Sequence, residues 1–97
     1  MRLRWSQTAK NDLLGIGRYI SRDKPDAARR WVENLRIHAR KACDNPYLGR
    51  MVPEWRREDI REVILKGYRI VYLIKEKEII VLTVSEGHRL LPSQAPV

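Results

Sequence analysis

The spacing of the apolar residues changes near the middle of the chain, and this change limits the possible folds more than any other feature of the sequence. Before residue 45, apolar residues recur every three or four positions, which is typical of amphipathic helices. From Ile60 onward they alternate with polar residues or form short runs rich in valine and isoleucine, as in β-strands. Helices followed by consecutive strands predict an α+β fold.

Two helices are expected after a short N-terminal strand, because the first five residues alternate apolar side chains with arginine. The first helix can be capped by Ser6 or Thr8. Its apolar stripe consists of Ala9, Leu13, Ile16 and Ile20. The second helix should begin at Pro25, which suits the first turn of a helix, and should end at Ala42 or Cys43.

Three strands are expected in the second half, at residues 60–65, 68–75 and 79–85. Lys66-Gly67 is a two-residue hairpin signal, whereas residues 47–59 should form a loop. Apolar residues occupy both parities of the last two strands, so both faces of the sheet should be covered over part of its length. The expected architecture is a single domain over residues 1–97: an N-terminal strand, a two-helix hairpin, and a three-stranded antiparallel meander in one sheet packed on the helices.

The chain is strongly basic, with 20 lysines and arginines against 12 aspartates and glutamates and a net charge of +8 in 97 residues. Most of this excess lies in residues 1–45, which hold 11 basic and 5 acidic residues. Such a balance fits a polyanionic partner, either a nucleic acid or an acidic protein. A charged, solvated surface is an equally good explanation of the excess.

Several classes of protein are not expected. No run of about 20 apolar residues suits a membrane span, and the first residues do not lead into the apolar region of a secretory signal. Cys43 is the single cysteine, which allows neither an intrachain disulfide nor a zinc cluster of thiolates. We therefore expect a cytoplasmic protein that has no membrane contact, no metal and no cofactor.

The predicted second helix carries a basic stripe formed by Arg29, Arg36 and Arg40, with Ile37 in the same sector. An apolar residue among these charges is expected either to be covered by a partner or to be an ordinary exposed residue. The stripe can follow a phosphate backbone or contact the acidic residues of a partner chain. No aromatic residues interleave with it, so sequence-specific recognition of nucleic acid is not expected.

Two features of the predicted sheet can carry chemistry. Arg69 lies in a largely apolar strand, so it needs a partner there: Glu62 or Glu86 for a structural role, or a phosphate for a functional one. Glu86, His88 and Arg89 directly follow the last strand. These residue types can perform acid–base chemistry on a phosphodiester, but a polar cluster that closes a strand is also ordinary in a loop.

Several stretches of the chain together resemble the RelE/ParE superfamily of bacterial toxins from type II toxin–antitoxin modules. Residues 8–13 resemble the A-x-x-D-L helix start of the family, and residues 25–30 resemble the start of its second helix. Residues 45–50 resemble its P-x-x-G-R loop. Residues 61–72 and 84–89 resemble its sheet signature. The resemblance covers nearly the whole chain, and it is the order and spacing of the stretches that is specific.

The resemblance implies an antiparallel sheet flanked by two helices and a toxin that is neutralised by a small acidic antitoxin encoded beside it, in a hetero-oligomeric complex. The basic stripe with Ile37 would then contact this antitoxin. Fold does not decide between the two mechanisms of the superfamily. ParE-like members bind and poison DNA gyrase, whereas RelE-like members cleave mRNA in the ribosomal A site.

In a RelE-like nuclease, Arg69, His88 and Arg89 would be the catalytic residues. The lysine-rich strand of that branch corresponds here to residues 60–64, which contain Arg61 and Glu62 and no lysine, and the expected tyrosine after the last strand is missing. These departures and the long helical hairpin favour the ParE-like branch, in which Arg61 and Arg69 are structural. A basic RNA-binding module unrelated to toxicity is a third interpretation.

Overall fold

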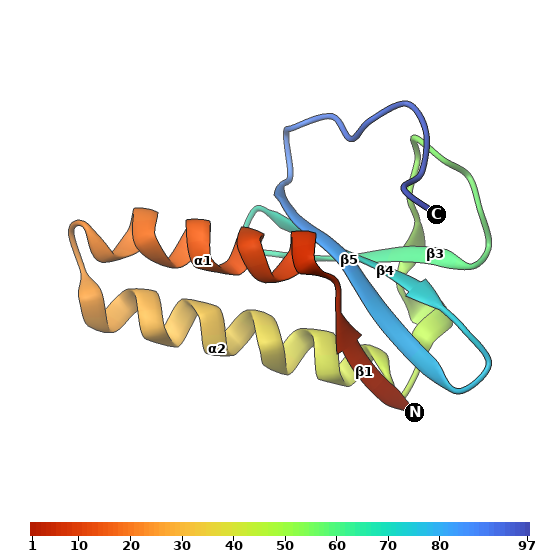
Figure 1. The fold of residues 1–97 in the computed structure, drawn as a ribbon, viewed down its shortest axis with the longest axis horizontal. Coiled ribbons are helices and arrows are strands. Elements are labelled where there is room, and N and C mark those ends of the chain that lie inside the picture. Colours follow the sequence, from red (N-terminus) through yellow and green to blue (C-terminus); the bar gives the residue numbers. More distant parts are fainter.

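A five-stranded mixed sheet with a helical hairpin against one face makes up the computed structural model, which describes residues 1–97 (Figure 1). In chain order the elements are β1 (Arg2–Trp5), α1 (Gln7–Ser21), α2 (Pro25–Ala42), the 3-10 helix η1 (Pro46–Leu48), β2 (Arg50–Met51), β3 (Ile60–Leu65), β4 (Tyr68–Ile74) and β5 (Glu78–Glu86). The sheet order is β1-β5-β4-β3-β2, with β1 parallel to β5 and the other pairs antiparallel. The predicted fold class and element order are confirmed.

The segment from residue 47 to 59 departs from the prediction, because it is not only a loop. It contains most of η1 and the two-residue strand β2, in which Arg50 pairs with Glu62 and Met51 with Arg61. A two-residue strand is too short to show any periodicity, so the sequence could not indicate it. β2 adds a fifth strand at the edge of the sheet opposite β1.

The two helices begin in different ways, α1 with a side-chain cap and α2 with a proline. Of the two predicted caps, Ser6 is the one used: its Oγ accepts a hydrogen bond from the amide of Ala9 at 3.0 Å and donates to the carbonyl of Leu82 at 2.8 Å. This side chain therefore fixes the start of α1 against β5. Pro25 opens α2 in its first turn, where a missing amide hydrogen costs nothing.

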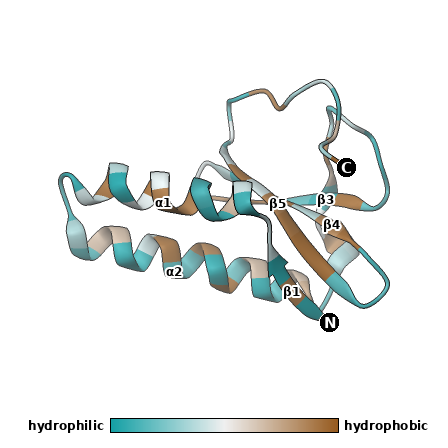
Figure 2. Ribbon diagram, in the orientation of Figure 1, coloured by the Kyte–Doolittle hydropathy of each residue, from teal (hydrophilic) through white to brown (hydrophobic).

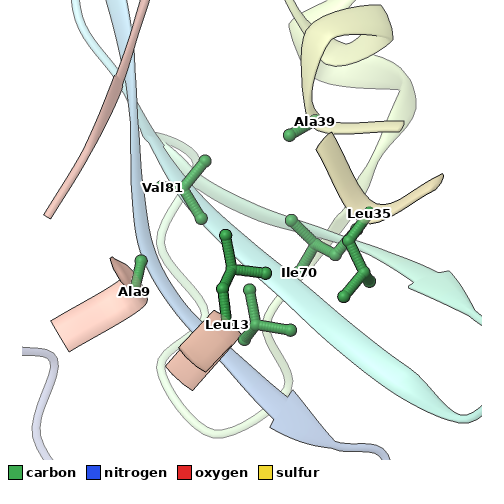
Figure 3. Close-up of a cluster of buried hydrophobic side chains, with 7 residues drawn as sticks. Ala9, Leu13, Leu35, Ala39, Ile70 and Val81 are labelled. Carbon is green, nitrogen blue, oxygen red and sulfur yellow. The ribbon is translucent and has the colours of Figure 1, made fainter. Parts of the chain in front are cut away.

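The main core lies between the helical hairpin and the sheet (Figure 3). Its buried side chains come from both helices and from β4 and β5: Ala9, Leu13, Leu35, Ala39, Ile70, Val81 and Val84. Figure 2 shows the apolar residues continuing along β5, whereas the helices carry hydrophilic residues between their apolar ones. No helix of the structure combines the length and the apolar character that spanning a membrane requires.

The opposite face of the sheet is covered by the C-terminal tail and by the segment between β2 and β3. Its buried residues are Val52, Ile60, Val71, Leu73, Ile80 and Leu82, against which Trp55, Leu91 and Ala95 pack. The tail has no helix or strand, but the indole of Trp55 donates to the carbonyl of Pro92 at 2.7 Å. The prediction that both faces of the sheet are covered is thus confirmed.

An irregularity in β5 lets α1 pack beside this strand. Val71 of β4 pairs with Thr83, whereas Tyr72 pairs with Val81, so β5 has one extra residue at this point. Asp12 of α1 accepts hydrogen bonds there from the hydroxyl of Thr83 at 2.6 Å and from the amide of Val84 at 2.9 Å. Asp12 thus accepts the hydrogen bond of the Val84 amide, which β1 cannot accept because β1 ends at Trp5.

Candidate functional site

Arg69 is the centre of a buried ion-pair network on the face of the sheet that the tail covers. It is 4% exposed, and its Nε donates to one carboxylate oxygen of Glu62 at 2.7 Å. Its two terminal nitrogens donate to the two oxygens of Glu54, both at 2.7 Å. The second oxygen of Glu62 accepts from Nε of Arg50 at 2.6 Å. The four side chains form a chain of alternating charge from the sheet edge to the tail.

The network strongly perturbs the carboxyl of Glu54. Hydrogen bonds from Arg69 lower the pKa of Glu54 from 4.5 to about 2, against the opposing effect of burial, and the amide of Leu91 adds a hydrogen bond at 3.0 Å. The two carboxylates raise the pKa of Arg69 in turn, with Glu54 as the larger influence. Arg69 also donates to the backbone carbonyl of Arg89 at 3.4 Å. The network therefore ties the tail to the sheet.

The sequence indicated this network only in part. The expected pairing of Arg69 with Glu62 is present, whereas Glu86 pairs instead with the imidazole of His88 at 3.1 Å. Glu54 was missed because it lies in the segment predicted to be a loop, where no periodicity points to a contact. The sequence signal for a second acceptor was Arg69 itself, because a buried arginine in a strand needs more than one hydrogen-bond acceptor.

The three residues expected in a nuclease site do not form one cluster. His88 is an exposed residue, and Arg89 approaches Arg69 through its backbone carbonyl. The imidazole of His88 pairs with Glu86 and not with a group near Arg69. The cation that would hold a phosphate is bound by two carboxylates, so an incoming phosphate would compete with negative charges already in place.

Arg61 stabilises the edge of the sheet at β2 and β3 from the face opposite the network. It neighbours Glu62 in β3, so its side chain points to the opposite face of the sheet from the network. Its guanidinium donates to the carbonyls of Glu58 at 3.0 Å and Gly49 at 3.2 Å, and it stacks over the ring of Tyr47 at 5.2 Å from the ring centre. These contacts hold η1 and β2 in place beside β3.

A groove of about 1050 Å³ runs between α1, α2 and β1, and we call it the helical groove. Its apolar surface includes Leu3, Trp5, Leu13, Leu14, Val32 and Ile37. Its rim is basic, with Lys10, Arg18, Arg36, Arg40 and Lys41 against one acid, Glu33.

Three of the four predicted partner-contact residues, Arg36, Ile37 and Arg40, line the helical groove. Arg29 lies on an adjoining shallower hollow that shares Arg36. Ile37 is 42% exposed. None of these arginines forms an ion pair. The groove therefore offers apolar area and unpaired positive charge to a partner.

Comparison with known proteins places this arrangement among toxins. A family model described as "ParE toxin of type II toxin-antitoxin system, parDE" matches residues 3–91. The chain is 34% identical over 93 residues to a protein of Sinorhizobium fredii named "Putative toxin Y4kP", a match that covers 94% of this chain and 93% of that protein. Its fold is similar to a chain of the "Chromosomal ParDE TA system from P. aeruginosa", with a TM-score of 0.73 and 22% identity, over 89% of this chain and 95% of that one.

Proposed function

This chain belongs to the family of ParE toxins of type II toxin–antitoxin systems, and we propose that it arrests growth by binding and poisoning DNA gyrase. The observation that carries this proposal is the state of Arg69. A toxin that works by binding needs no free catalytic cation, and here Arg69 is buried and bound by Glu54 and Glu62. The strand arginine then stabilises the sheet, while exposed surfaces make the contacts with the target.

The alternative mechanism is a RelE-like, ribosome-dependent mRNA endonuclease. It would need Arg69, His88 and Arg89 around one scissile phosphate, with a group that can move a proton. The two carboxylates on Arg69 and the pairing of His88 with Glu86 argue against that arrangement in this chain. An RNA-binding module without toxicity is supported by the positive charge alone.

We further propose that a cognate acidic antitoxin, encoded next to the toxin, neutralises it by covering the helical groove. An amphipathic segment can place apolar side chains on Leu14 and Ile37 while its acidic residues meet Arg36 and Arg40. The complex would be a hetero-oligomer. Both proposed partners lie in the cytoplasm, so the chain is expected to act there.

A supercoiling assay tests the gyrase proposal. The purified chain is incubated with bacterial gyrase, ATP and relaxed plasmid, and we expect lost supercoiling together with linear DNA after detergent and protease treatment. Prior addition of the antitoxin should prevent both effects. In parallel, a reconstituted translation mixture is examined for mRNA cleavage at A-site codons, which should be absent. The nuclease would be established instead if the wild type cleaved mRNA, the variant His88→Ala did not, and gyrase stayed active in the presence of the wild type.

Charge reversal in the helical groove tests the antitoxin proposal. Arg36→Glu should weaken antitoxin binding at least tenfold in a titration of the purified proteins, because it places a negative charge against an acidic segment. Lys75→Glu is the matched control, since it makes the same change in charge at an exposed residue between β4 and β5. Equal affinities of the two variants would show that the antitoxin binds elsewhere.

A further inference from the structure

Helix α1 separates two clefts that differ in their chemistry. One side of the helix contributes Lys10, Leu14 and Arg18 to the helical groove. The other side contributes Asp12 and Tyr19 to a second cleft of about 710 Å³. This tyrosine cleft, as we call it, is bounded by the start of β4, the end of β5 and the tail, and its lining includes Tyr19, Tyr68, Glu86, Arg89, Leu90 and Pro92.

Two aromatic rings and a carboxylate converge in the tyrosine cleft. Tyr68 stands edge-on to Trp31 at a ring separation of 5.3 Å, which fixes its orientation. Burial raises the pKa of the Tyr68 hydroxyl, and the nearby charge of Glu86 and the phenol of Tyr19 raise it further. Tyr19 is 69% exposed, and neither phenol has a hydrogen-bond partner within the chain. Both hydroxyls and the exposed ring of Tyr19 are therefore available to an incoming group, whereas the ring of Tyr68 packs in part against the main core.

The charge of the tyrosine cleft is opposite in sign to that of the helical groove. Its ionisable side chains are the carboxylates Asp12 and Glu86 and one cation, Arg89, besides the two phenols. Asp12 is engaged with β5. Glu86 is exposed, and its single ionic contact is with the imidazole of His88. In a chain with a net charge of +8, a lining with two carboxylates against one cation is a local exception.

We propose that the tyrosine cleft is the docking site for a lysine or arginine side chain of the target protein, flanked by apolar residues that pack on Leu90. The faces of tyrosine rings attract cations, and the carboxylate of Glu86 supplies an ion-pair partner. This inference rests on the proposed function in one respect: the target is a protein. An acidic antitoxin fits the helical groove on the other side of α1, so the two partners are expected to use different surfaces.

Two pairs of exposed-residue variants test the proposal. Glu86→Lys reverses the cleft charge, and its control Glu76→Lys makes the same change between β4 and β5. Tyr19→Ala removes a cleft ring, and its control Tyr47→Ala removes a ring of similar exposure, 61%, at η1. The readouts are growth arrest on induction in bacteria, affinity for purified gyrase, and affinity for the antitoxin, after circular dichroism has verified that each variant is folded.

We expect both cleft variants to lose growth arrest and at least tenfold in gyrase affinity, while both controls stay within twofold of the wild type and all four retain antitoxin binding. Cleft variants that arrest growth as the controls do would overturn the proposal, and so would a selective loss of antitoxin binding. If the wild type arrests growth without binding gyrase, the gyrase proposal fails, and the growth readout still decides the role of the cleft. If the wild type neither arrests growth nor binds gyrase, the gyrase proposal and the cleft proposal both fail.

Discussion

Replacing Glu54 by glutamine should remove the stabilisation that its carboxylate contributes to the buried network. The carboxyl pKa falls from 4.5 to about 2 on folding, and each pKa unit corresponds to about 1.4 kcal/mol of preference for the charged form. The Glu54 side chain is 16% exposed, so solvent screens this preference only weakly. Glu54→Gln should therefore lower the free energy of unfolding at pH 7 by about 3 kcal/mol, a large share of the roughly 5–15 kcal/mol typical of a domain.

The same pKa shift makes a prediction about pH. Because folding lowers the pKa of Glu54, its contribution is fully present above pH 4.5 and is lost as the pH falls toward 2. The wild type should lose about 3 kcal/mol across that range from this group, whereas Glu54→Gln should lack this component. The pKa of Asp59 is also lowered, by Arg57, but that pair is present in both proteins and its effect cancels in the difference.

Urea unfolding followed by circular dichroism measures both effects, at pH 7 and at steps down to pH 2.5 in low salt. Urea is preferred because guanidinium salts would screen the ion pairs. Glu76→Gln is the control for the loss of one exposed carboxylate, and it should unfold like the wild type at pH 7. A difference below about 1 kcal/mol between wild type and Glu54→Gln, or parallel pH profiles for the two, would refute the assignment of the network as a major source of stability.

Three further changes probe other contacts of the fold. Arg69→Met leaves Glu54 without its cation and Glu62 with Arg50 alone, and it should cost about 3–5 kcal/mol at pH 7 in the same urea assay. Asp12→Ala leaves the amide of Val84 without its acceptor; it should cost about 1–3 kcal/mol and speed hydrogen exchange at that amide. Gly49→Ala places a methyl group against the hydroxyl of Tyr72 and 2.9 Å from the carbonyl oxygen of Glu62, and it should lower the free energy of unfolding by about 1–3 kcal/mol, measured by thermal denaturation.

The parts of the fold that the sequence predicted are those set by local repetition. The apolar stripe of α1 and the alternation in β3 each repeat several times, so single exceptions do not obscure them. The Lys66-Gly67 pair also predicted the turn between β3 and β4. Both residues adopt positive φ angles there, a conformation that favours glycine. By contrast, β2 has two residues and no repeat, and it depends on tertiary contacts, namely its pairing with β3 and the ion pair of Arg50 with Glu62.

The candidate site was less predictable, because its contacts join segments that are distant in sequence. Glu54 and Arg69 are 15 residues apart, and nothing in the local pattern of either residue indicates the other. The tail is a stronger case: it forms no helix or strand, yet Leu91 and Ala95 pack on the sheet and Glu54 binds its backbone. The sequence showed that Arg69 needs a partner, and only the tertiary structure selects which carboxylates are near.

The buried network also links the stability of the sheet to the shape of the proposed target surface. Glu54 binds the amide of Leu91, and Arg69 binds the carbonyl of Arg89. These two tail residues line the tyrosine cleft together with Leu90. The helical groove contains no tail residue. Loss of the Glu54 carboxylate should therefore loosen one wall of the tyrosine cleft and leave the helical groove intact.

Glu54→Gln should accordingly weaken gyrase binding severalfold while antitoxin affinity stays within twofold of the wild type, at a temperature well below the unfolding transition of the variant. The matched control is Gly49→Ala, which should also destabilise the chain, but from the sheet edge next to η1. If overall destabilisation were the cause, both variants would lose both affinities in parallel. Unchanged gyrase binding by a folded Glu54→Gln protein would show that the tail does not shape the surface that meets the target, and that the network acts on stability alone.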